Sequence, residues 1–284
     1  MSTGRHSAAQ LDPSLDDYQL ASALVREAGQ LALLMRMGGL SGEQKTSVSD
    51  VVTAADRAAE AYVLEQLRRC RPEDSILGEE GASFAGTSGR TWVIDPVDGT
   101  YNFLQGSSYW CSAIALKGGG AAASTVSASA DPEVILGAIY QPEMEKLWLG
   151  GVDHAATLNG ETLVSPSSAD LDQLGAATYI HPRWLVDPMA AMPWHAAAVS
   201  AATLRMFGSG SCDLARVADG EIGVWFQHSC PEWDWLPGKA IVRAAGGRTA
   251  VVAVNGLNWF VAGGANSVKQ VVAALQSGSV QHLG

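Results

Sequence analysis

Apolar side chains that recur at three- and four-residue spacing predict two helices near the start of the chain. The first spans residues 15–37 and stops at the Gly38-Gly39 pair. The second opens at Thr53 and runs to about Arg69, with Asp56 three residues after Thr53, as in a capping box. Between the two helices lies a polar stretch, residues 41–50, for which the pattern predicts no regular element.

Short apolar runs predict strands in the rest of the chain, and these alternate with helices in its second half. The predicted strands are residues 75–77, 91–94, 111–116, 134–140, 146–149, 222–226, 249–254 and 258–261. The predicted helices are residues 210–218, 234–245 and 267–275, and the Gly/Ala/Ser-rich residues 118–130 are expected to form a flexible loop. A boundary near residue 150 would divide the chain into an N-terminal α+β half, 1–150, and a C-terminal α/β half, 151–284.

Charge and cysteine content narrow the functional classes. The 284 residues include 18 Lys and Arg against 29 Asp and Glu, a net charge of −11, so most of the surface should repel nucleic acid. No apolar run is long enough to span a membrane, and the N-terminus has no signal-peptide pattern. The four cysteines form no C-x-x-C pair, which disfavours a structural zinc site and suits reduced thiols in a cytoplasmic protein.

The segment Trp92-Val-Ile-Asp95-Pro-Val-Asp98-Gly-Thr100 carries the clearest chemical signal, because an apolar strand runs directly into two carboxylates. An Asp-Gly turn before a helix would explain Asp98 and Gly99. It would not explain Asp95 at the end of a buried strand, where an unpaired carboxylate is costly. A hard divalent cation would neutralise both carboxylates, and ligands that are all oxygen suit Mg²⁺. Gly99 and Thr100 would then present backbone N–H groups to an anion.

Three further acidic segments are ambiguous when each is taken alone. Gly78-Glu79-Glu80 is typical of a solvated loop, and Asp234, between two tryptophans, is typical of a helix N-cap. Asp56 fits a capping box with Thr53, near Lys45 and Asp50, but could also orient a hydroxyl or a water. Together with Asp95 and Asp98, these segments supply the carboxylates and the threonine hydroxyl of a two-metal phosphatase.

These motifs, in this order, resemble the inositol monophosphatase family of Mg²⁺-dependent, lithium-sensitive phosphatases. The resemblance extends over nearly the whole chain and includes residues 45–56, 78–80, 95–103, 158–161 and 233–234. It implies a mixed α+β fold, a layered αβαβα sandwich of the inositol monophosphatase and sugar phosphatase type, assembled as a homodimer. It also implies about two to three Mg²⁺ ions in each active site and a small phosphate monoester as substrate.

The resemblance assigns roles residue by residue. Glu79, Asp95 and the main-chain carbonyl of Val97 would hold one Mg²⁺, while Asp95, Asp98 and Asp234 would hold a second. Thr100, paired with Asp56, would position and activate the attacking water. The backbone of Gly99 and Thr100 would bind the phosphate, and Asp98, Asp234 and Gln227 would face the substrate. Most metal ligands thus lie in the N-terminal half, with Asp234 and the substrate side in the C-terminal half.

The substrate is less determined by these motifs. Tyr101-Asn102-Phe103 resembles the inositol and histidinol phosphatase branches, and the Gly208-Ser-x-x-x-Asp213-Leu pattern resembles bacterial inositol phosphatases, which favours inositol 1-phosphate. Gln227 stands where many inositol phosphatases have a glutamate, and Gly210-Ser211 where small apolar residues are common, so another polyol or amino alcohol stays open. His228, Trp225 and Trp235 could contact the substrate, although core or interface packing is the simpler interpretation.

Alternatives remain at three levels. Within the family, the chain could be a histidinol-phosphate phosphatase or another sugar or nucleotide phosphatase. A haloacid-dehalogenase-type enzyme would need Asp-x-Asp-x-Thr, whereas the spacing here is Asp-x-x-Asp-x-Thr. A catalytically silent regulatory or binding protein on the same fold would be expected to have lost a ligand, and Glu79, Asp95, Asp98, Asp234 and Thr100 are all present.

Overall fold

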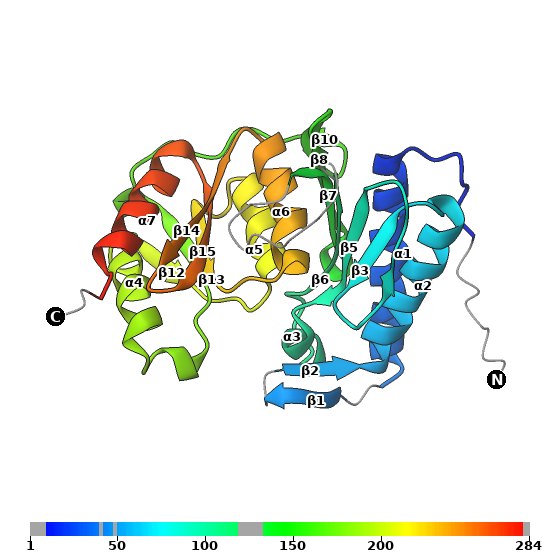
Figure 1. Ribbon diagram of the computed structural model, residues 1–284, viewed down its shortest axis with the longest axis horizontal. Coiled ribbons are helices and arrows are strands. Elements are labelled where there is room, and N and C mark those ends of the chain that lie inside the picture. The colour runs from blue at the N-terminus through cyan, green and yellow to red at the C-terminus, as the bar shows by residue number, and fades with distance from the viewer. Residues whose placement is uncertain (1–9, 40–41, 48–49, 119–132, 281–284) are drawn as a thin grey trace.

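A computed structural model describes residues 10–39, 42–47, 50–118 and 133–280, and the side chains of residues 42–52 lie outside the description. Its elements form five layers in the order helices, sheet, helices, sheet, helices (Figure 1). The layered αβαβα sandwich expected from the sequence is therefore confirmed.

The helices of the described part are α1 (Asp17–Met37), α2 (Ala54–Cys70), α3 (Thr100–Leu104), α4 (Pro188–Ala198), α5 (Gly210–Ala218), α6 (Glu232–Ala244) and α7 (Ala265–Ser277), with short 3₁₀ turns η1 (Pro142–Met144), η2 (Leu171–Gln173) and η3 (Pro182–Trp184). The strands are β1 (Gly42–Ser47), β2 (Asp50–Thr53), β3 (Ser75–Gly78), β4 (Ser83–Phe84), β5 (Thr91–Asp98), β6 (Cys111–Lys117), β7 (Val134–Gln141), β8 (Lys146–Gly151), β9 (His154–Leu158), β10 (Glu161–Thr162), β11 (Gly175–Thr178), β12 (Thr203–Arg205), β13 (Val224–His228), β14 (Arg248–Val254) and β15 (Leu257–Gly263).

The first sheet has eight strands in the order β10-β9-β8-β7-β6-β5-β3-β4. Its pairs are antiparallel except β3 with β5, which run parallel. Helices α1 and α2 cover one face and bury a core that includes Leu24, Leu67 and Trp92. Helices α5 and α6 cover the other face.

The second sheet has five strands in the order β12-β11-β13-β15-β14, and here β11 pairs in parallel with both β12 and β13. One face packs against α5 and α6, so these two helices lie between the sheets (Figure 1). The other face packs against α4 and α7 around Phe226 and Trp259. The two sheets thus share α5 and α6 as their middle helical layer.

The structure confirms both N-terminal helices and corrects several details. Thr53 caps α2 and Asp56 completes the capping box, as predicted. Residues 42–47 and 50–53 form the antiparallel hairpin β1–β2, although the sequence pattern predicted no regular element for residues 41–50; its backbone pairing does not depend on apolar alternation. Helix α4 escaped prediction because Pro188 and Pro193 interrupt its sequence; Pro188 occupies the first turn, where a missing N–H costs nothing.

The predicted division near residue 150 stays a prediction; β9 and β10, which follow that residue, belong to the first sheet. The predicted loop at residues 118–130 lies almost entirely outside the described residues. All four cysteines are buried and unpaired. Among the described helices, none combines the length and apolar character that a membrane crossing requires.

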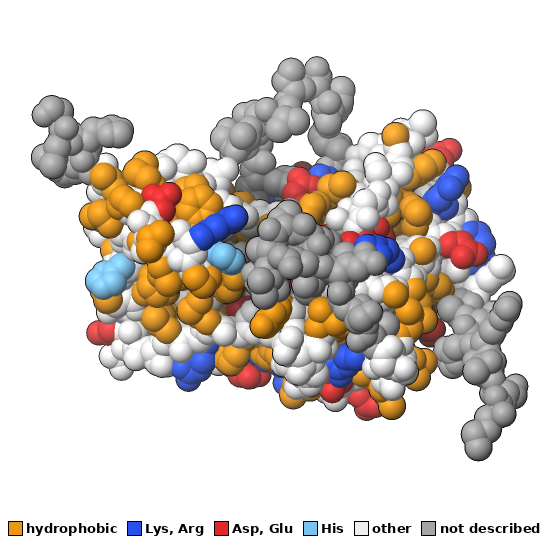
Figure 2. All heavy atoms as spheres, turned by 90° about the horizontal axis from the view of Figure 1, so that it is seen from below, with side chains coloured by type: hydrophobic (Ala, Val, Ile, Leu, Met, Phe, Trp, Pro, Cys, Tyr) orange, Lys and Arg blue, Asp and Glu red, His pale blue; other side chains and the backbone are white. Residues whose placement is uncertain are grey.

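Exposed hydrophobic side chains gather on one part of the surface. Figure 2 shows them on the left of the face seen from below, the side of the molecule that carries the second sheet and α4. The large hydrophobic side chains that are exposed between residues 185 and 207 are Leu185, Val186, Met192, Val199, Leu204, Met206 and Phe207.

Candidate active site

The two parallel strands of the first sheet place Glu79 beside the end of β5. Gly78, the last residue of β3, pairs with Ile94, and the Glu79 N–H donates to the Ile94 carbonyl at 3.2 Å. Parallel strands have their carboxyl ends at one sheet edge, where ligands commonly bind. Glu79 and Asp95 are therefore neighbours at this edge. Glu79 lies in the half-buried turn after β3, and its side chain lines a pocket, so its place allows more than the role of a solvated loop.

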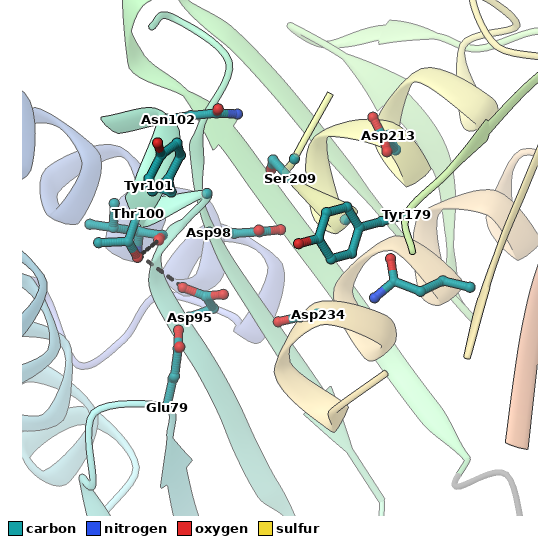
Figure 3. A pocket seen from close by; sticks show the side chains of 15 residues that line it. Glu79, Asp95, Asp98, Thr100, Tyr101, Asn102, Tyr179, Ser209, Asp213 and Asp234 are labelled. Atoms are coloured by element: carbon teal, nitrogen blue, oxygen red, sulfur yellow. Dashed lines mark hydrogen bonds between the residues drawn. The ribbon is translucent and has the colours of Figure 1, made fainter. Parts of the chain in front are cut away.

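A β-bulge explains how two carboxylates three residues apart serve the same site. Asp95 pairs with Ala113 and Asp98 with Cys111, so β5 uses one residue more than β6 over this stretch. In a regular strand, residues i and i+3 point to opposite faces. The extra residue cancels that alternation, and both side chains point into the pocket (Figure 3). Proline tolerates such a position because Pro96 has no N–H to pair.

The turn after β5 requires a glycine and delivers a threonine hydroxyl. Gly99 has φ 93°, in the left-handed region, and a Cβ there would approach the Tyr109 carbonyl oxygen to 3.2 Å. Helix α3 begins at Thr100, whose Oγ1 lies 3.0 Å from both Asp56 Oδ1 and the Val97 carbonyl oxygen. The first N–H groups of a helix have no partner within it, so this turn can offer donors to an anion.

Asp56 performs two tasks with two different oxygens. Its Oδ2 accepts from the Thr53 backbone N–H at 3.1 Å and from the Thr53 hydroxyl, which is the capping-box arrangement. Its Oδ1 accepts from the Thr100 hydroxyl. Asp56 is 1% exposed, and burial raises the pKa of its carboxyl. Both interpretations of Asp56 that the sequence allowed are thus present together.

The middle helical layer supplies the opposite wall of the pocket. Asp234 lies in the first turn of α6, whose N-cap is Pro231, so the N-cap interpretation of Asp234 is wrong. The Ser211 N–H in α5 donates to Asp98 Oδ2 at 2.5 Å, joining this layer to β5. Asp213, also on α5, accepts from the Tyr109 hydroxyl at 2.6 Å, and burial raises the pKa of Asp213 to about 8.

The acidic side chains of the pocket repel one another, so a bound cation would stabilise them. Burial, together with the carboxylates of Glu79, Asp98 and Asp234, raises the pKa of Asp95 well above its usual range. Burial and the carboxylates of Asp98 and Glu79 raise the pKa of Asp234 as well. The pocket has a volume of about 280 Å³, and its lining includes no Lys, Arg or His among the described residues. Several buried carboxylates without a cationic side chain are unfavourable unless another cation neutralises them.

The donor set fits a hard divalent cation. The pocket offers carboxylate oxygens of Glu79, Asp95, Asp98 and Asp234, and Val97 also belongs to its lining. Oxygen donors without sulfur or imidazole are the ligands of Mg²⁺ rather than Zn²⁺. Within the described part of the chain, no three acidic, His or Cys side chains already lie at the mutual distances of metal ligands.

Most residues predicted for the site meet in this pocket. Its lining contains the predicted Glu79, Asp95, Val97, Asp98, Gly99, Thr100, Gln227 and Asp234. Asp56 lies behind Thr100 and is not part of the lining. The side chains of Lys45 and Asp50 lie outside the description. Trp225 and Trp235 are buried against each other, and His228 packs on Trp184 and Trp259, so these three belong to the core.

Sequence reasoning missed several other lining residues, namely Tyr101, Asn102, Tyr179, Ser209 and Asp213 as direct pocket contacts. Asn102 could have been suspected, because it directly follows the Asp-Gly-Thr turn, and its Nδ2 donates to the carbonyls of Tyr109 and Phe207. Tyr179 gave no signal, because the short strand before it was not predicted. Its place depends on the pairing of β11 with β13.

Comparison with known proteins shows the family to which this chain is similar. The model of the inositol monophosphatase family matches residues 16–278. The inositol-1-monophosphatase of Rhizobium meliloti is 32% identical over 207 residues, covering 70% of this chain and 71% of that protein. The Nus factor SuhB of Escherichia coli K12 is 30% identical over 217 residues, covering 73% of this chain and 74% of that protein. The crystal structure of extragenic suppressor protein suhB from Bartonella henselae superposes with a TM-score of 0.79 at 25% identity, covering 91% of this chain and 98% of the other.

Proposed function

The chain belongs to the inositol monophosphatase family, and from this premise we propose that it is a Mg²⁺-dependent phosphatase of a small monoester, with inositol 1-phosphate as the first candidate. The observation that supports this most strongly is the Thr100 hydroxyl, held by Asp56 at 3.0 Å beside a pocket that is lined by all four carboxylates expected to bind metal. That combination provides a place for a hydrolytic water next to a place for cations.

Glu79, Asp95, Asp98, Asp234 and the Val97 carbonyl would hold the ions. The Val97 oxygen already accepts from the Thr100 hydroxyl but has a second lone pair for a cation. When bound, Mg²⁺ supplies charge neutralisation at the phosphate and lowers the pKa of a coordinated water.

The chain's own residues would orient the nucleophile and the phosphate. Because the Thr100 proton is directed to Asp56 or Val97, a lone pair of its oxygen is free to accept a hydrogen bond from the attacking water. A proton taken from that water would pass to Thr100 as the hydroxyl gives its own proton to the Asp56 carboxylate. Asp56 therefore fixes the direction in which Thr100 accepts. The N–H groups at the start of α3 would bind equatorial phosphate oxygens, as helix N-termini bind anions. No side chain is needed as a covalent nucleophile.

Two further expectations belong to this proposal. The match to an inositol-1-monophosphatase favours inositol 1-phosphate over histidinol phosphate, while Gln227 in the lining keeps other polyols open. A cytoplasmic homodimer is in keeping with four buried, unpaired cysteines and with the exposed hydrophobic surface around α4. Sedimentation velocity would measure the oligomeric state.

The test is phosphate release from a panel of esters, measured with Mg²⁺ and with EDTA. The panel contains inositol 1-phosphate, histidinol phosphate, fructose 1,6-bisphosphate and adenosine 3′,5′-bisphosphate, ranked by kcat/KM. Asp95→Asn should lose nearly all turnover, whereas Asp172→Asn, which changes an exposed carboxylate on η2, should match the wild type.

A silent binding protein is the rival function, and a relative named as a Nus factor gives it weight. The same panel separates the two. Metal-dependent turnover of any ester that Asp95→Asn abolishes would support the phosphatase, and no turnover of any ester by the wild type would support the rival.

A further inference from the structure

Tyr179 and Gln227 occupy equivalent places at the ends of two neighbouring parallel strands. In the β11–β13 pair, Ala177 lies opposite Trp225 and Thr178 opposite Phe226. One residue further along each strand are Tyr179 and Gln227, and both line the pocket. Side chains alternate along a strand, so these two continue the face that carries Ala177 and Trp225. That face packs against the middle helical layer, which also carries Asp234.

The Tyr179 phenol crosses the pocket from the second sheet toward the carboxylates of the first. Figure 3 shows its hydroxyl end directed to the space between Asp98 and Asp234. Tyr179 is half-buried, and its hydroxyl forms no hydrogen bond with any described residue. Burial raises the pKa of Tyr179, although Arg183 opposes the shift, so the phenol is neutral and can both donate and accept.

Gln227 is in the same situation on the adjacent strand. Its carboxamide makes no hydrogen bond with the described side chains, and like the phenol it offers both a donor and an acceptor to the pocket. The turn at Gly99 and Thr100 forms a different part of the lining, on the first sheet. A phosphate held at that turn would leave the alcohol part of the ester to face Tyr179 and Gln227.

We propose that Tyr179 is a specificity-determining residue that selects a ring-shaped, uncharged alcohol as the leaving group. Its ring would pack on the face of the substrate ring, its hydroxyl would hydrogen-bond to one hydroxyl of that ring, and Gln227 would hydrogen-bond to another. This inference rests on the proposed phosphatase function. It also predicts discrimination against a second phosphate, because the described lining carries no cationic side chain to receive one.

Arg183 lies close enough to this wall to lower the pKa of Tyr179 against the effect of burial. It is exposed on η3, lies 5.4 Å from the centre of the Trp184 ring, and is outside the pocket lining. A bisphosphate whose second phosphate reached out of the pocket could be favoured by this residue. Arg183→Gln is therefore the matched control for charge at the rim.

The experiment compares inositol 1-phosphate, acyclic glycerol 2-phosphate and fructose 1,6-bisphosphate with wild type, Tyr179→Phe and Tyr179→Ala in Mg²⁺. Loss of one neutral hydrogen bond of about 1 kcal/mol should lower kcat/KM of Tyr179→Phe on inositol 1-phosphate about fivefold. Removing the ring in Tyr179→Ala should lower the ratio of kcat/KM for inositol 1-phosphate to that for glycerol 2-phosphate about tenfold or more, chiefly through KM. Arg183→Gln should leave the ranking of the three esters as in wild type.

Three results would overturn the assignment. They are an equal loss on the cyclic and acyclic esters, no loss on either, or a wild-type preference for the bisphosphate that Arg183→Gln removes. If Tyr179→Ala does not fold, Tyr179→Phe carries the test, since it keeps the packing and changes only the hydroxyl. Failure of the underlying phosphatase proposal is distinguishable, because the wild type would then release phosphate from none of the three esters.

Discussion

The double use of Asp56 leads to a sharp prediction for Asp56→Asn. Oδ2 accepts from Thr53 to cap α2, and Oδ1 accepts from the Thr100 hydroxyl. An asparagine has only one oxygen, so it can serve one of these partners. If the oxygen keeps the cap, the amide donates to Thr100 and occupies the lone pair proposed to accept the water's hydrogen bond, and no carboxylate is left to receive the relayed proton. If it flips, two N–H donors face each other at Thr53.

The structure indicates which effect should dominate. Keeping the cap costs little. The free energy of unfolding of Asp56→Asn should therefore lie within about 1 kcal/mol of the wild-type value, which is the typical contribution of one neutral hydrogen bond. Positioned proton acceptors contribute about 10²–10⁴-fold to catalysis, and kcat should fall by about that factor with little change in KM. Thr53→Ala should do the reverse. It should lose about 1 kcal/mol of stability, or roughly 2–4 °C in Tm, and far less kcat than Asp56→Asn.

The assay combines thermal unfolding with steady-state kinetics on the best substrate of the panel. Asp56→Asn, Thr100→Ala and the double variant should have similar kcat values, because residues that act as one unit are not additive. Thr100→Ser, which keeps the hydroxyl, should recover most of the activity. Fully additive losses, or an Asp56→Asn enzyme that is destabilised yet fully active, would refute the proposed link between Asp56 and Thr100.

Three other predictions concern metal, acid and packing. Replacing Asp95 with Asn removes one of several repelling buried carboxylates, so its Tm in EDTA should equal or exceed that of wild type. Mg²⁺ at about 100 Kd should raise the wild-type Tm by roughly 5–10 °C, and Asp95→Asn by less, in a thermal shift assay; equal shifts would contradict the metal assignment. Burial raises the pKa of Asp74, but hydrogen bonds led by Arg90 outweigh it and lower the pKa below 3.8. This carboxylate therefore stabilises the fold above pH 3.8 and loses that contribution as the pH falls through its lower folded pKa, so the stability deficit of Asp74→Asn in urea unfolding should narrow between about pH 5 and pH 3. A Cβ at Gly137 would meet the Pro237 carbonyl oxygen at 2.1 Å, so Gly137→Ala should cost at least about 1–3 kcal/mol in urea unfolding, whereas Gly175→Ala, with its nearest contact at 3.4 Å, should be close to neutral.

The parts of the site that sequence could predict are those that a short segment contains. Asp95, Asp98, Gly99 and Thr100 lie in one strand and turn, where the cost of a buried carboxylate already indicated a cation. Asp234 looked like a helix cap when taken alone, and only the family resemblance linked it to the others. The place of Tyr179 could not be predicted from the sequence, because it follows from the register of β11 on β13, which no local pattern encodes.

The same distinction applies to the fold. Helices α1 and α2 each bury one apolar face, so a 3.6-residue period marks them in the sequence. Hairpin β1–β2 is held by backbone pairing and its first strand contains no apolar alternation, while α4 contains an internal proline, Pro193, so neither element shows the periodic pattern that predicts a strand or a helix. What the pattern could not show is how the layers stack. The resemblance implied the stacking, and the pocket depends on it.

In our proposal, the layered arrangement places the residues for hydrolysis and the residues that choose the alcohol on different sheets. Glu79, Asp95 and Asp98 come from the first sheet, while Tyr179 and Gln227 come from the second. Between them, the middle helices contribute Asp234 and the Ser211 N–H that holds Asp98 at 2.5 Å. Hydrolysis, in our proposal, depends on the first sheet and this middle layer, and the choice of alcohol depends on the second sheet. Substitutions at the ends of β11 and β13 can therefore change the substrate while the carboxylates and the Thr100–Asp56 pair stay intact. This separation gives a physical reason why one hydrolytic motif can serve several phosphate esters, and why that motif identified the reaction here more readily than the substrate.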